Sequence, residues 1–265
     1  GGVEHAVLHL LYARFFVKAL KKCGYLDFDE PFKNLLTQGM VCHHTFKDDG
    51  GNWVHPKDVV KKDDNNFIHK DSGAKITLGR SEKMSKSKKN VVEPENIINS
   101  YGADTARLFM LSDSPAEKNL EWSDTGIEGC FKYLNKLWRL VNDFAENDFS
   151  ANDFINFDNE EFFDEKLVNN LNKSEQDLIK LTHKTIKSVT ENYEKMAFNV
   201  VIAKIREFSN YIEKFSAKSD EAKKAKAFAL NNLVLLLSPI TPHLAEELWF
   251  LLKNDNFIAN NVDFP

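Results

Sequence analysis

Apolar positions recur at three- and four-residue spacing through most of the second half of the chain. The first such stretch, residues 127–144, has apolar or aromatic side chains at 127, 131, 134, 137, 138, 141 and 144, and it predicts an amphipathic helix. Three more helices are predicted near 175–193, 199–215 and 220–237, and Thr241 is placed to cap a short last one. This pattern favours a helical bundle without internal repeats.

The first half of the chain combines one apolar helix with short strands. Residues 4–22 predict a helix that is apolar on nearly every face, so we expect it to be buried. Met40-Val41-Cys42 predicts a core strand, and the turn signals at 47–52 and 71–73 predict hairpins. The second hairpin is followed by residues 83–89, which we call the lysine loop.

Two short helices are expected between the strands and the bundle. Pro94 suits the first turn of a helix that ends near Ser100, because proline lacks an N–H that this turn leaves unbonded in any case. Asp104 is placed to cap a following helix that extends through Leu111. The order of elements predicts an α/β part followed by a mainly α-helical part.

Composition fits a chain of two unequal globular parts. With 265 residues, of which 42% are hydrophobic, the chain can bury a sizeable core. Charged residues make up 28% and the formal net charge is -5, so the overall charge does not indicate a nucleic-acid binder. An RNA partner would need a local basic face, and the main cluster of cations lies at 80–89.

Cysteine spacing and the lack of a long apolar run bear on the compartment. Cys23, Cys42 and Cys130 are widely separated and form no Cys-x-x-Cys pair, which favours a reducing, cytoplasmic compartment over a disulfide framework. The opening apolar run is interrupted by histidine, arginine and lysine, so we expect neither a membrane span nor a membrane partner.

The densest candidate chemistry lies in Lys83-Met84-Ser85-Lys86-Ser87. Two ammonium groups and two hydroxyls within this pentapeptide provide donors for a polyphosphate, and they can neutralise its charge during nucleotidyl transfer. On composition alone a solvated basic turn is the better interpretation, because short lysine runs are common on protein surfaces. Further motifs are needed to decide between these two interpretations.

No metal site is predicted in this chain. His5 and His9 are spaced to face one side of the opening helix, but Glu4 precedes the first histidine instead of following it, and no third ligand is evident. His43 and His44 are adjacent in a predicted strand and therefore point to opposite faces of it.

Several segments together resemble a known enzyme family. They are Gly1-Gly2-Val3-Glu4-His5-Ala6, the following run to Phe16, Leu36-Thr37-Gln38-Gly39-Met40-Val41, the lysine pentapeptide, Tyr101-Gly102-Ala103-Asp104-Thr105, Leu120-Glu121-Trp122 and Thr241-Pro242-His243. Combined, these segments resemble bacterial-type leucyl-tRNA synthetases, which are class I aminoacyl-tRNA synthetases. The pentapeptide alone matches many class I synthetases, whereas the opening segment and Leu120-Glu121-Trp122 point to leucine. The likeness is weakest at 142–172, a polar and acidic interval that predicts a long loop.

The resemblance implies the second half of a Rossmann-type catalytic fold followed by a helical bundle. The expected parts are a catalytic portion at 1–80, the lysine loop with a stem-contact region at 81–125, and an anticodon-binding-like bundle at 126–265. The parent enzyme is expected to carry an upstream half with a His-x-Gly-His-type signature, an editing domain and a small C-terminal domain. The resemblance therefore implies a portion of a larger enzyme that is inactive alone.

The resemblance also implies the reaction, leucine–tRNA ligation, and its site. Leucine, ATP with Mg²⁺, and tRNA(Leu) are the expected substrates, and the missing N-terminal half is an expected partner. The catalytic residues implied are Lys83, Ser85, Lys86 and Ser87. The residues implied to contact ATP or the adenylate are Gly2, Glu4, His5, Gly39, Met40, Val41 and Lys86. The residues implied to contact tRNA are Arg107, Trp122, Lys132, Lys136 and Arg139.

Two alternative functions stay open at this point. A valyl, isoleucyl or methionyl enzyme shares the lysine loop, and a non-catalytic tRNA-binding module would not need the missing half. Asp104 and Trp122 also have purely structural interpretations, as a helix cap and as a packing residue.

Overall fold

A computed structural model describes residues 5–63, 66–147, 171–252, 258 and 264–265 of the chain. The chain divides into two compact units. The sheet unit comprises residues 1–94 and 114–123, and the helical unit comprises residues 95–113 and 124–265. Among the described helices, none is long and apolar enough to cross a membrane.

The opening helix is the largest departure from the sequence prediction. Ala6–Leu11 form a π-helix, η1, and Tyr12–Lys22 continue as the α-helix α1. Every residue of α1 is described and none is buried; Phe15 and Phe16 are 62% and 60% exposed. The expectation of a buried helix is therefore wrong for this chain by itself, because the described residues leave its apolar side chains uncovered.

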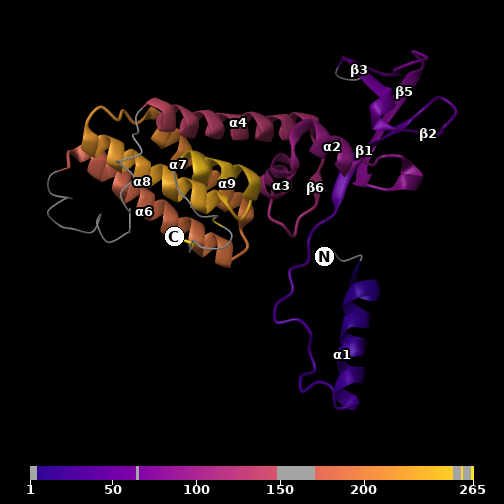
Figure 1. Ribbon diagram of the computed structural model, residues 1–265. Helices are drawn as coiled ribbons and strands as arrows, with labels where there is room; N and C mark the ends of the chain where they lie inside the picture. Colours follow the sequence, from indigo (N-terminus) through magenta and orange to yellow (C-terminus); the bar gives the residue numbers. More distant parts are fainter. Residues whose placement is uncertain (1–4, 64–65, 148–170, 253–257, 259–263) are drawn as a thin grey trace. The chain divides into compact units, whose positions relative to one another are not determined.

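The described part of the sheet unit contains six short strands (Figure 1). In chain order they are β1 (Val41–Lys47), β2 (Trp53–Val54), β3 (Val59–Asp63), β4 (Asn66–His69), β5 (Lys75–Lys83) and β6 (Leu120–Glu121), with a 3₁₀ turn, η2, at Pro56–Asp58. The order across the sheet is β2-β1-β5-β4-β3 with antiparallel neighbours, and β6 pairs with β1 in parallel. Both predicted hairpins, β1–β2 and β4–β5, are confirmed.

A small apolar cluster lies at the centre of this sheet. Phe46, Val54 and Ile76 form the buried part of the cluster, and Val59 and Phe67 pack against it. So few side chains bury little apolar surface, and backbone pairing therefore carries a large share of the order in this unit.

Strands β1 and β5 approach each other closely at a bulge. Their register shifts between His44 and Phe46. At this point Thr45 Oγ1 donates a hydrogen bond to the carbonyl of Arg80 at 3.1 Å. A Cβ atom on Gly79 would lie 2.3 Å from Thr45 Oγ1, so glycine is required for the close approach. The bulge shapes the end of β5 that leads into the lysine loop.

The helical unit is a bundle of α-helices. In chain order the helices are α2 (Pro94–Tyr101), α3 (Ala103–Ser112), α4 (Asp124–Asn147), α6 (Lys173–Glu194), α7 (Phe198–Lys214), α8 (Asp220–Leu237) and α9 (Pro242–Leu251). Helices α6, α7 and α8 pack against one another, and α9 packs against α4 and α8 (Figure 1). The helices predicted from periodicity are confirmed, with boundaries within three residues of those expected.

Aliphatic and aromatic side chains fill the interior of the bundle. Phe144, Phe208 and Leu237 are among those that are at most 1% exposed. Two members of the apolar repeat on α4, Phe131 and Trp138, are instead 39% and 38% exposed. The repeat therefore predicted the helix correctly but not every residue of its buried face.

Asp104 caps a helix other than the one predicted. Its Oδ2 accepts a hydrogen bond from the backbone N–H of Leu244, in the first turn of α9, at 2.8 Å. Its Oδ1 accepts from Arg107 at 2.8 Å, and Gly102 is the N-cap of α3. Thr241 occupies the predicted N-cap position of α9, but among the described contacts its side chain makes no cap bond. Asp104 thus fastens α3 to α9, since a carboxylate satisfies N–H groups that a helix N-terminus leaves unbonded.

The predicted fold class, an α/β part followed by a mainly α-helical bundle, is confirmed. The predicted long loop at 142–172 is helical at its start, because α4 extends to Asn147. Most of the remainder, residues 148–170, lies outside the described residues.

Candidate nucleotide-binding loop

The lysine loop begins at the last residue of β5. The backbone N–H of Met84 donates to a carbonyl of β1 at 3.0 Å, which extends the strand pairing by one residue. Ser85 is extended, Lys86–Lys88 form a 3₁₀ turn, η3, and Lys89 has a φ of 55°. Lysine at positive φ is uncommon because its Cβ crowds the backbone, so the loop turns through a strained residue.

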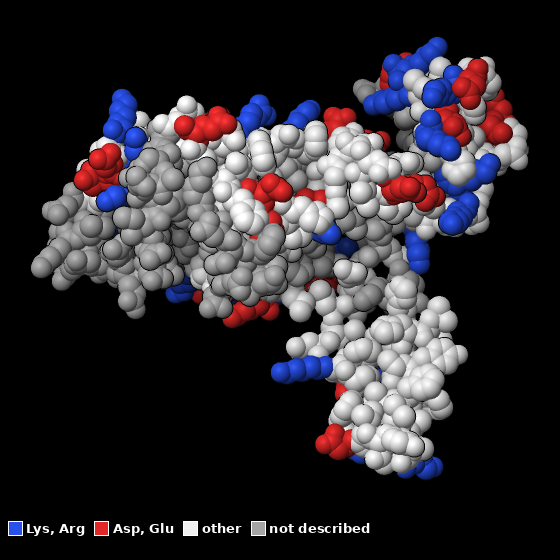
Figure 2. Space-filling view, in the orientation of Figure 1, with Lys and Arg blue, Asp and Glu red and all other residues white. Residues whose placement is uncertain are grey.

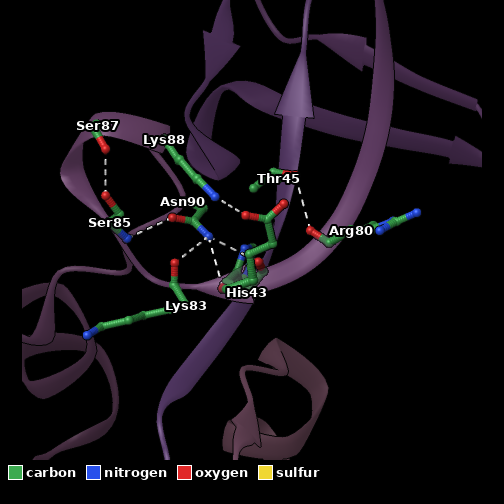
Figure 3. A network of polar contacts seen from close by, with 9 residues as sticks. His43, Thr45, Arg80, Lys83, Ser85, Ser87, Lys88 and Asn90 are labelled. Carbon is green, nitrogen blue, oxygen red and sulfur yellow. Dashed lines mark hydrogen bonds and ion pairs between the residues drawn. The ribbon is translucent and has the colours of Figure 1, made fainter. Parts of the chain in front are cut away.

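Asn90 joins the end of the loop to its beginning (Figure 3). Asn90 is 1% exposed, and its Oδ1 accepts a hydrogen bond from the backbone N–H of Ser85 at 2.8 Å. Its Nδ2 lies within hydrogen-bond distance of the carbonyl oxygens of His43, Glu82 and Lys83, at 3.1, 3.2 and 3.4 Å, and shares its two hydrogens among them. One side-chain amide thus connects β1, the end of β5 and the start of the loop.

Sequence reasoning did not single out Asn90, although it follows the predicted loop directly. A signal was present, because asparagine between a lysine run and the apolar pair Val91-Val92 is typical of a side chain that bonds to nearby backbone. The sequence did not indicate that its partners also include His43, which lies 47 positions away.

The lysines of the loop differ in their partners. Lys88 forms an ion pair with Glu82, which neutralises its charge within the sheet unit (Figure 3). Lys86 is exposed, and in the part of the chain that the structure describes it has no acidic partner. An unpaired ammonium keeps its charge and its donors for a ligand. Lys86 is therefore the cation of this loop best able to meet an anion.

The two serines of the pentapeptide bond to each other, with 2.7 Å between Ser85 Oγ and Ser87 Oγ. A hydroxyl donates one hydrogen bond and accepts two, so the pair retains one O–H for a ligand. Ser85 is half-buried, whereas Lys86 and Ser87 are exposed. The predicted catalytic residues Lys83, Ser85, Lys86 and Ser87 thus share one loop, whose exposed tip is formed by Lys86 and Ser87.

The opening segment is described only in part. Gly2 and Glu4, predicted to contact ATP, lie outside the described residues. His5 is exposed at the start of η1, and within the described residues its side chain makes no cap bond. His9 has an edge-to-face contact with Phe32, with 5.8 Å between ring centroids, which gives it a structural partner. Among the described residues, no group of three His, Cys, Asp or Glu side chains is arranged to hold a metal ion.

The segment Gly39–Val41 is fixed against the chain that precedes β6. The backbone N–H of Gly39 donates to a backbone carbonyl of that chain, and the N–H of Met40 donates to Asn119 Oδ1, each at 2.9 Å. A Cβ on Gly39 would lie 2.0 Å from the carbonyl oxygen of Lys118, so glycine is required here. Both N–H groups are used within the chain, and so are the carbonyl oxygens of Met40 and Val41, which accept from the backbone N–H groups of Leu120 and Met84.

Three of the cations predicted to contact tRNA lie on α4. Lys132, Lys136 and Arg139 line a groove of about 670 Å³ in the helical unit, together with Lys226. Acidic side chains accompany them, and Figure 2 shows both signs of charge along the edge formed by α4. Lys136, for example, pairs with Glu213 at 2.7 Å. The groove therefore carries mixed charge.

The other two predicted tRNA contacts have structural partners. Arg107 donates to the carboxylate of Asp104 at 2.8 Å. Trp122 belongs to the sheet unit, where its backbone N–H donates to the carbonyl of Cys42 at 2.8 Å. The first contact gives the Arg107 side chain a role within the helical unit, and the second holds the backbone of Trp122 to β1.

A polar cluster lies buried between α4 and α7. Tyr133 Oη and Ser209 Oγ are 3.1 Å apart, and the Arg206 guanidinium lies 4.5 Å from the centre of the Tyr133 ring. Burial raises the pKa of Tyr133 to about 12, although the serine hydrogen bond and the Arg206 charge act in the opposite direction. The phenol therefore stays neutral and links the two helices.

Two family models match separate parts of the chain. Residues 73–123, which contain the lysine loop, match the model of tRNA synthetases class I (I, L, M and V). Residues 175–265, which contain α7 to α9, match the anticodon-binding domain of tRNA ligase. In these two parts, which include the lysine loop and most of the bundle, the chain is similar to class I tRNA synthetases.

Individual relatives narrow the likeness to one amino acid. The chain is 46% identical over 259 residues to the leucine–tRNA ligase of Paramagnetospirillum magneticum, and 47% identical over 249 residues to that of Wolbachia pipientis. These matches cover 98% and 94% of this chain but 28% of each relative. The chain resembles leucine–tRNA ligases along nearly all of its own length and spans little more than a quarter of theirs.

A solved structure agrees with this assignment. The agnB2 LeuRS of Agrobacterium radiobacter K84, in a ternary complex with tRNA and LeuAMS, is 28% identical to the chain with a TM-score of 0.68. The match covers 100% of this chain and 28% of that one. The fold predicted from the family resemblance is confirmed.

Proposed function

We propose that the chain supplies the lysine loop and the helical bundle of a leucine–tRNA ligase. The enzyme would join leucine to tRNA(Leu) through leucyl-adenylate, converting ATP to AMP and pyrophosphate. The observation that carries the proposal is the identity of 43% to 47% with leucine–tRNA ligases over nearly the whole chain. The same relatives disfavour the valyl, isoleucyl and methionyl alternatives, with which the lysine loop is shared.

Lys86 is proposed as the main contact to the leaving group. When the leucine carboxylate attacks the α-phosphorus of ATP, the bond from that phosphorus to the bridging oxygen breaks, and negative charge accumulates on the departing pyrophosphate. An ammonium that meets this charge as it develops lowers the barrier instead of merely tightening ATP binding. Lys86 suits this task because it is exposed and has no acidic partner among the described residues.

Further groups of the loop would support that contact. Lys83 adds a second ammonium, and the bonded hydroxyls of Ser85 and Ser87 can donate to phosphate oxygens without adding charge. We assign Lys88 a structural role because Glu82 already neutralises it. Mg²⁺ would accompany the phosphates of ATP, whose oxygens are the ligands that this ion prefers.

The rest of the enzyme is the proposed partner of η1 and α1. Val7, Leu8, Phe15 and Phe16 are between 60% and 67% exposed. Figure 2 shows a mostly uncharged surface over this segment. Large apolar side chains exposed together are typical of a surface that another part covers. The upstream half of the catalytic fold is the expected cover, and it would complete the ATP site.

Six residues remain proposed contacts to ATP or the adenylate in that completed site. They are Gly2, Glu4, His5, Gly39, Met40 and Val41. For the last three the chain supports contact mainly through packing, because two of their N–H groups and two of their carbonyl oxygens are already bonded within the chain.

Docking of tRNA(Leu) is proposed for the helical unit. The LeuRS of Agrobacterium radiobacter was crystallised with tRNA, and Lys132, Lys136 and Arg139 line one groove of this unit. Contacts from these side chains would go to phosphates, which position an RNA without reading its sequence. Because the groove carries mixed charge, we expect binding by the chain alone to be weak and salt-sensitive.

The proposal is tested by leucine-dependent ATP–pyrophosphate exchange. The chain alone is expected to give no exchange, because ATP binding needs the upstream half. We define the hybrid enzyme as the Paramagnetospirillum magneticum leucine–tRNA ligase in which this chain replaces its matching segment. In the hybrid enzyme, Lys86→Ala is expected to slow exchange at least about a hundredfold, the scale of losing one strong charge contact in the transition state.

Lys88→Ala is the matched control. It removes the same kind of charge two residues further along the loop, but this charge is already paired, so we expect exchange to fall by less than about fivefold. Equal rates for Lys86→Ala and the unmodified hybrid would remove Lys86 from the mechanism. Exchange that followed valine, isoleucine or methionine more strongly than leucine would overturn the assignment to leucine.

A further inference from the structure

The side chain of Asn90 is the point at which both ends of the lysine loop meet. Within the described part of the chain it makes four hydrogen bonds, to Ser85, His43, Glu82 and Lys83. In Figure 3 these bonds converge on one amide beneath the loop. Nothing in the proposed function uses Asn90, which is 1% exposed and therefore shielded from a ligand.

We propose that Asn90 is the positioning residue of the lysine loop, and that its amide sets where Lys86 and Ser87 are held during adenylate formation. The inference rests on the function proposed for this loop. It adds a residue that acts through Lys86 and not by touching ATP.

The tip of the loop has few other attachments. Within η3 the bonds are those of Lys88 N–H to Ser85 and of Lys89 N–H to Lys86, both at 3.2 Å. The ion pair between Lys88 and Glu82 and the hydrogen bond between the hydroxyls of Ser85 and Ser87 are further ties. All these contacts are exposed or half-buried, so they give little resistance to local opening. The buried amide at the base is therefore the main constraint on the path of the tip.

The strained backbone beside Asn90 makes this constraint necessary. Lys89 holds a φ of 55°, a left-handed conformation that is strained for a non-glycine residue. Strain of this kind persists only where neighbouring contacts hold it. The four bonds of Asn90, the next residue, supply that hold.

Asparagine is chemically specific for this position. Its carbonyl accepts from the Ser85 N–H while its NH₂ group donates to strand carbonyls, and both functions are needed at once. Aspartate can accept but not donate, and its charge would face three carbonyl oxygens. Glutamine has the same groups on a side chain longer by one methylene, and the site is too well packed to admit it without displacement.

The structural half of the inference is tested on the chain itself by hydrogen exchange. Asn90→Ala is expected to speed exchange of the Ser85 amide at least about tenfold, because its acceptor is lost and the loop opens more often. Thr45→Val is the matched control. Thr45 is equally buried at 1% exposure and bonds to the Arg80 carbonyl in the same pair of strands, but it makes no contact with the loop in the described residues. It is expected to leave the Ser85 amide protected.

The functional half is tested by pyrophosphate exchange in the hybrid enzyme. Asn90→Ala and Asn90→Asp are expected to lower kcat by about tenfold to a hundredfold, the scale of misplacing a catalytic group by about 1 Å. The KM for ATP is expected to change less than about threefold, since Lys86 acts mainly in the transition state. Thr45→Val is expected to match the unmodified hybrid.

A pH profile separates positioning from a general loss of structure. A carboxyl group placed among three carbonyl oxygens is protonated more readily than usual, and its protonated form regains one donor. The kcat of the unmodified hybrid divided by the kcat of Asn90→Asp is therefore expected to decrease toward one as pH falls from about 8 to about 6. The ratio for Asn90→Ala is expected to stay constant over the same range.

The outcomes distinguish the inference from the function on which it rests. Loss of kcat with Lys86→Ala but normal kcat with both Asn90 variants would overturn the positioning role and leave the proposed function intact. Normal exchange with Lys86→Ala would overturn the proposed function of the loop. Equal losses with Thr45→Val and Asn90→Ala, or unchanged protection of the Ser85 amide in Asn90→Ala, would also reject Asn90 as the positioning residue.

Discussion

The two units of the chain are held together in different ways. The helical unit has a continuous interior of aliphatic and aromatic side chains supplied by α4 and by α6 to α9. The sheet unit buries a small cluster around Phe46, and its other buried groups include the polar side chains of Thr45 and Asn90. Burial of apolar area dominates the stability of the first unit, whereas specific hydrogen bonds shape the second.

The difference follows what each unit is proposed to do. A bundle that docks RNA needs a stable scaffold, and a large apolar core provides it. A loop that closes on a nucleotide must move, so its tip carries few apolar contacts and its base is fixed by polar ones. Large apolar truncations should therefore damage the helical unit most, and small polar changes should act on the loop.

The largest effect is expected from truncation of the bundle core. Phe208, on α7, is 1% exposed, and Phe208→Ala is expected to lower the free energy of unfolding by about 3–5 kcal/mol. Urea unfolding followed by circular dichroism measures this change. Tyr211→Ala on the same helix is the control, because Tyr211 is 40% exposed and should cost less than about 1 kcal/mol. Similar losses from both variants would contradict the apolar-core description.

A smaller effect is expected where the helical unit depends on a polar contact. Asp104→Ala removes the acceptor for the Leu244 N–H and the partner of Arg107, and it is expected to cost about 1–3 kcal/mol. Asp104→Asn keeps one acceptor and should recover part of the loss in the same urea experiment. A neutral Asp104→Ala variant would show that the link between α3 and α9 contributes nothing.

The capping box at the start of α6 gives a test at the scale of a single helix end. Asn172 Oδ1 accepts from the Glu175 N–H at 3.1 Å, and Glu175 Oε2 accepts from the Asn172 N–H at 2.8 Å. Asn172→Ala is expected to lower the free energy of unfolding by about 1 kcal/mol. Asn172→Ser retains an acceptor and should remain close to the unmodified chain, whereas equal destabilisation by both would argue against capping.

The smallest expected effect is a pH dependence of the helical unit. Burial lowers the pKa of His183 on α6 below its ordinary value of 6.5. At a pH between the lowered pKa of the folded chain and the ordinary pKa of the unfolded chain, the unfolded chain therefore binds more protons than the folded chain. The contribution of His183 to stability is complete above about pH 6.5 and declines as pH falls toward the lowered pKa. The effect should be small because the side chain is half-buried. His183→Gln is expected to remove this part of the pH dependence, and an unchanged profile would assign it to other groups.

The sequence predicted the helical unit well because each helix carries its own pattern. The spacing of apolar residues located α6, α7 and α8 within a few residues. It did not identify Phe131 and Trp138 as exposed, since a helix pattern does not tell how wide the covering surface is. The cap of α9 by Asp104 also escaped prediction, because its partner Leu244 lies 140 positions away.

The sheet unit was predicted less completely, because its order depends on contacts that are distant in sequence. Turn residues located both hairpins, but nothing local indicated that Val41 pairs with Leu120. The lysine loop was found from its composition and family resemblance, whereas the role of Asn90 needed the positions of three strand carbonyls. The burial of α1 was predicted wrongly, because an apolar pattern shows that a surface needs cover but not which chain supplies it.

The most direct test of the central claim is the kinetic analysis of Lys86→Ala in the hybrid enzyme. If the ammonium meets pyrophosphate as it departs, kcat for leucine-dependent exchange should fall at least about a hundredfold while the KM for ATP changes little. A variant with normal kcat, or one in which the whole loss appears in KM, would contradict the claim that this loop acts on the leaving group.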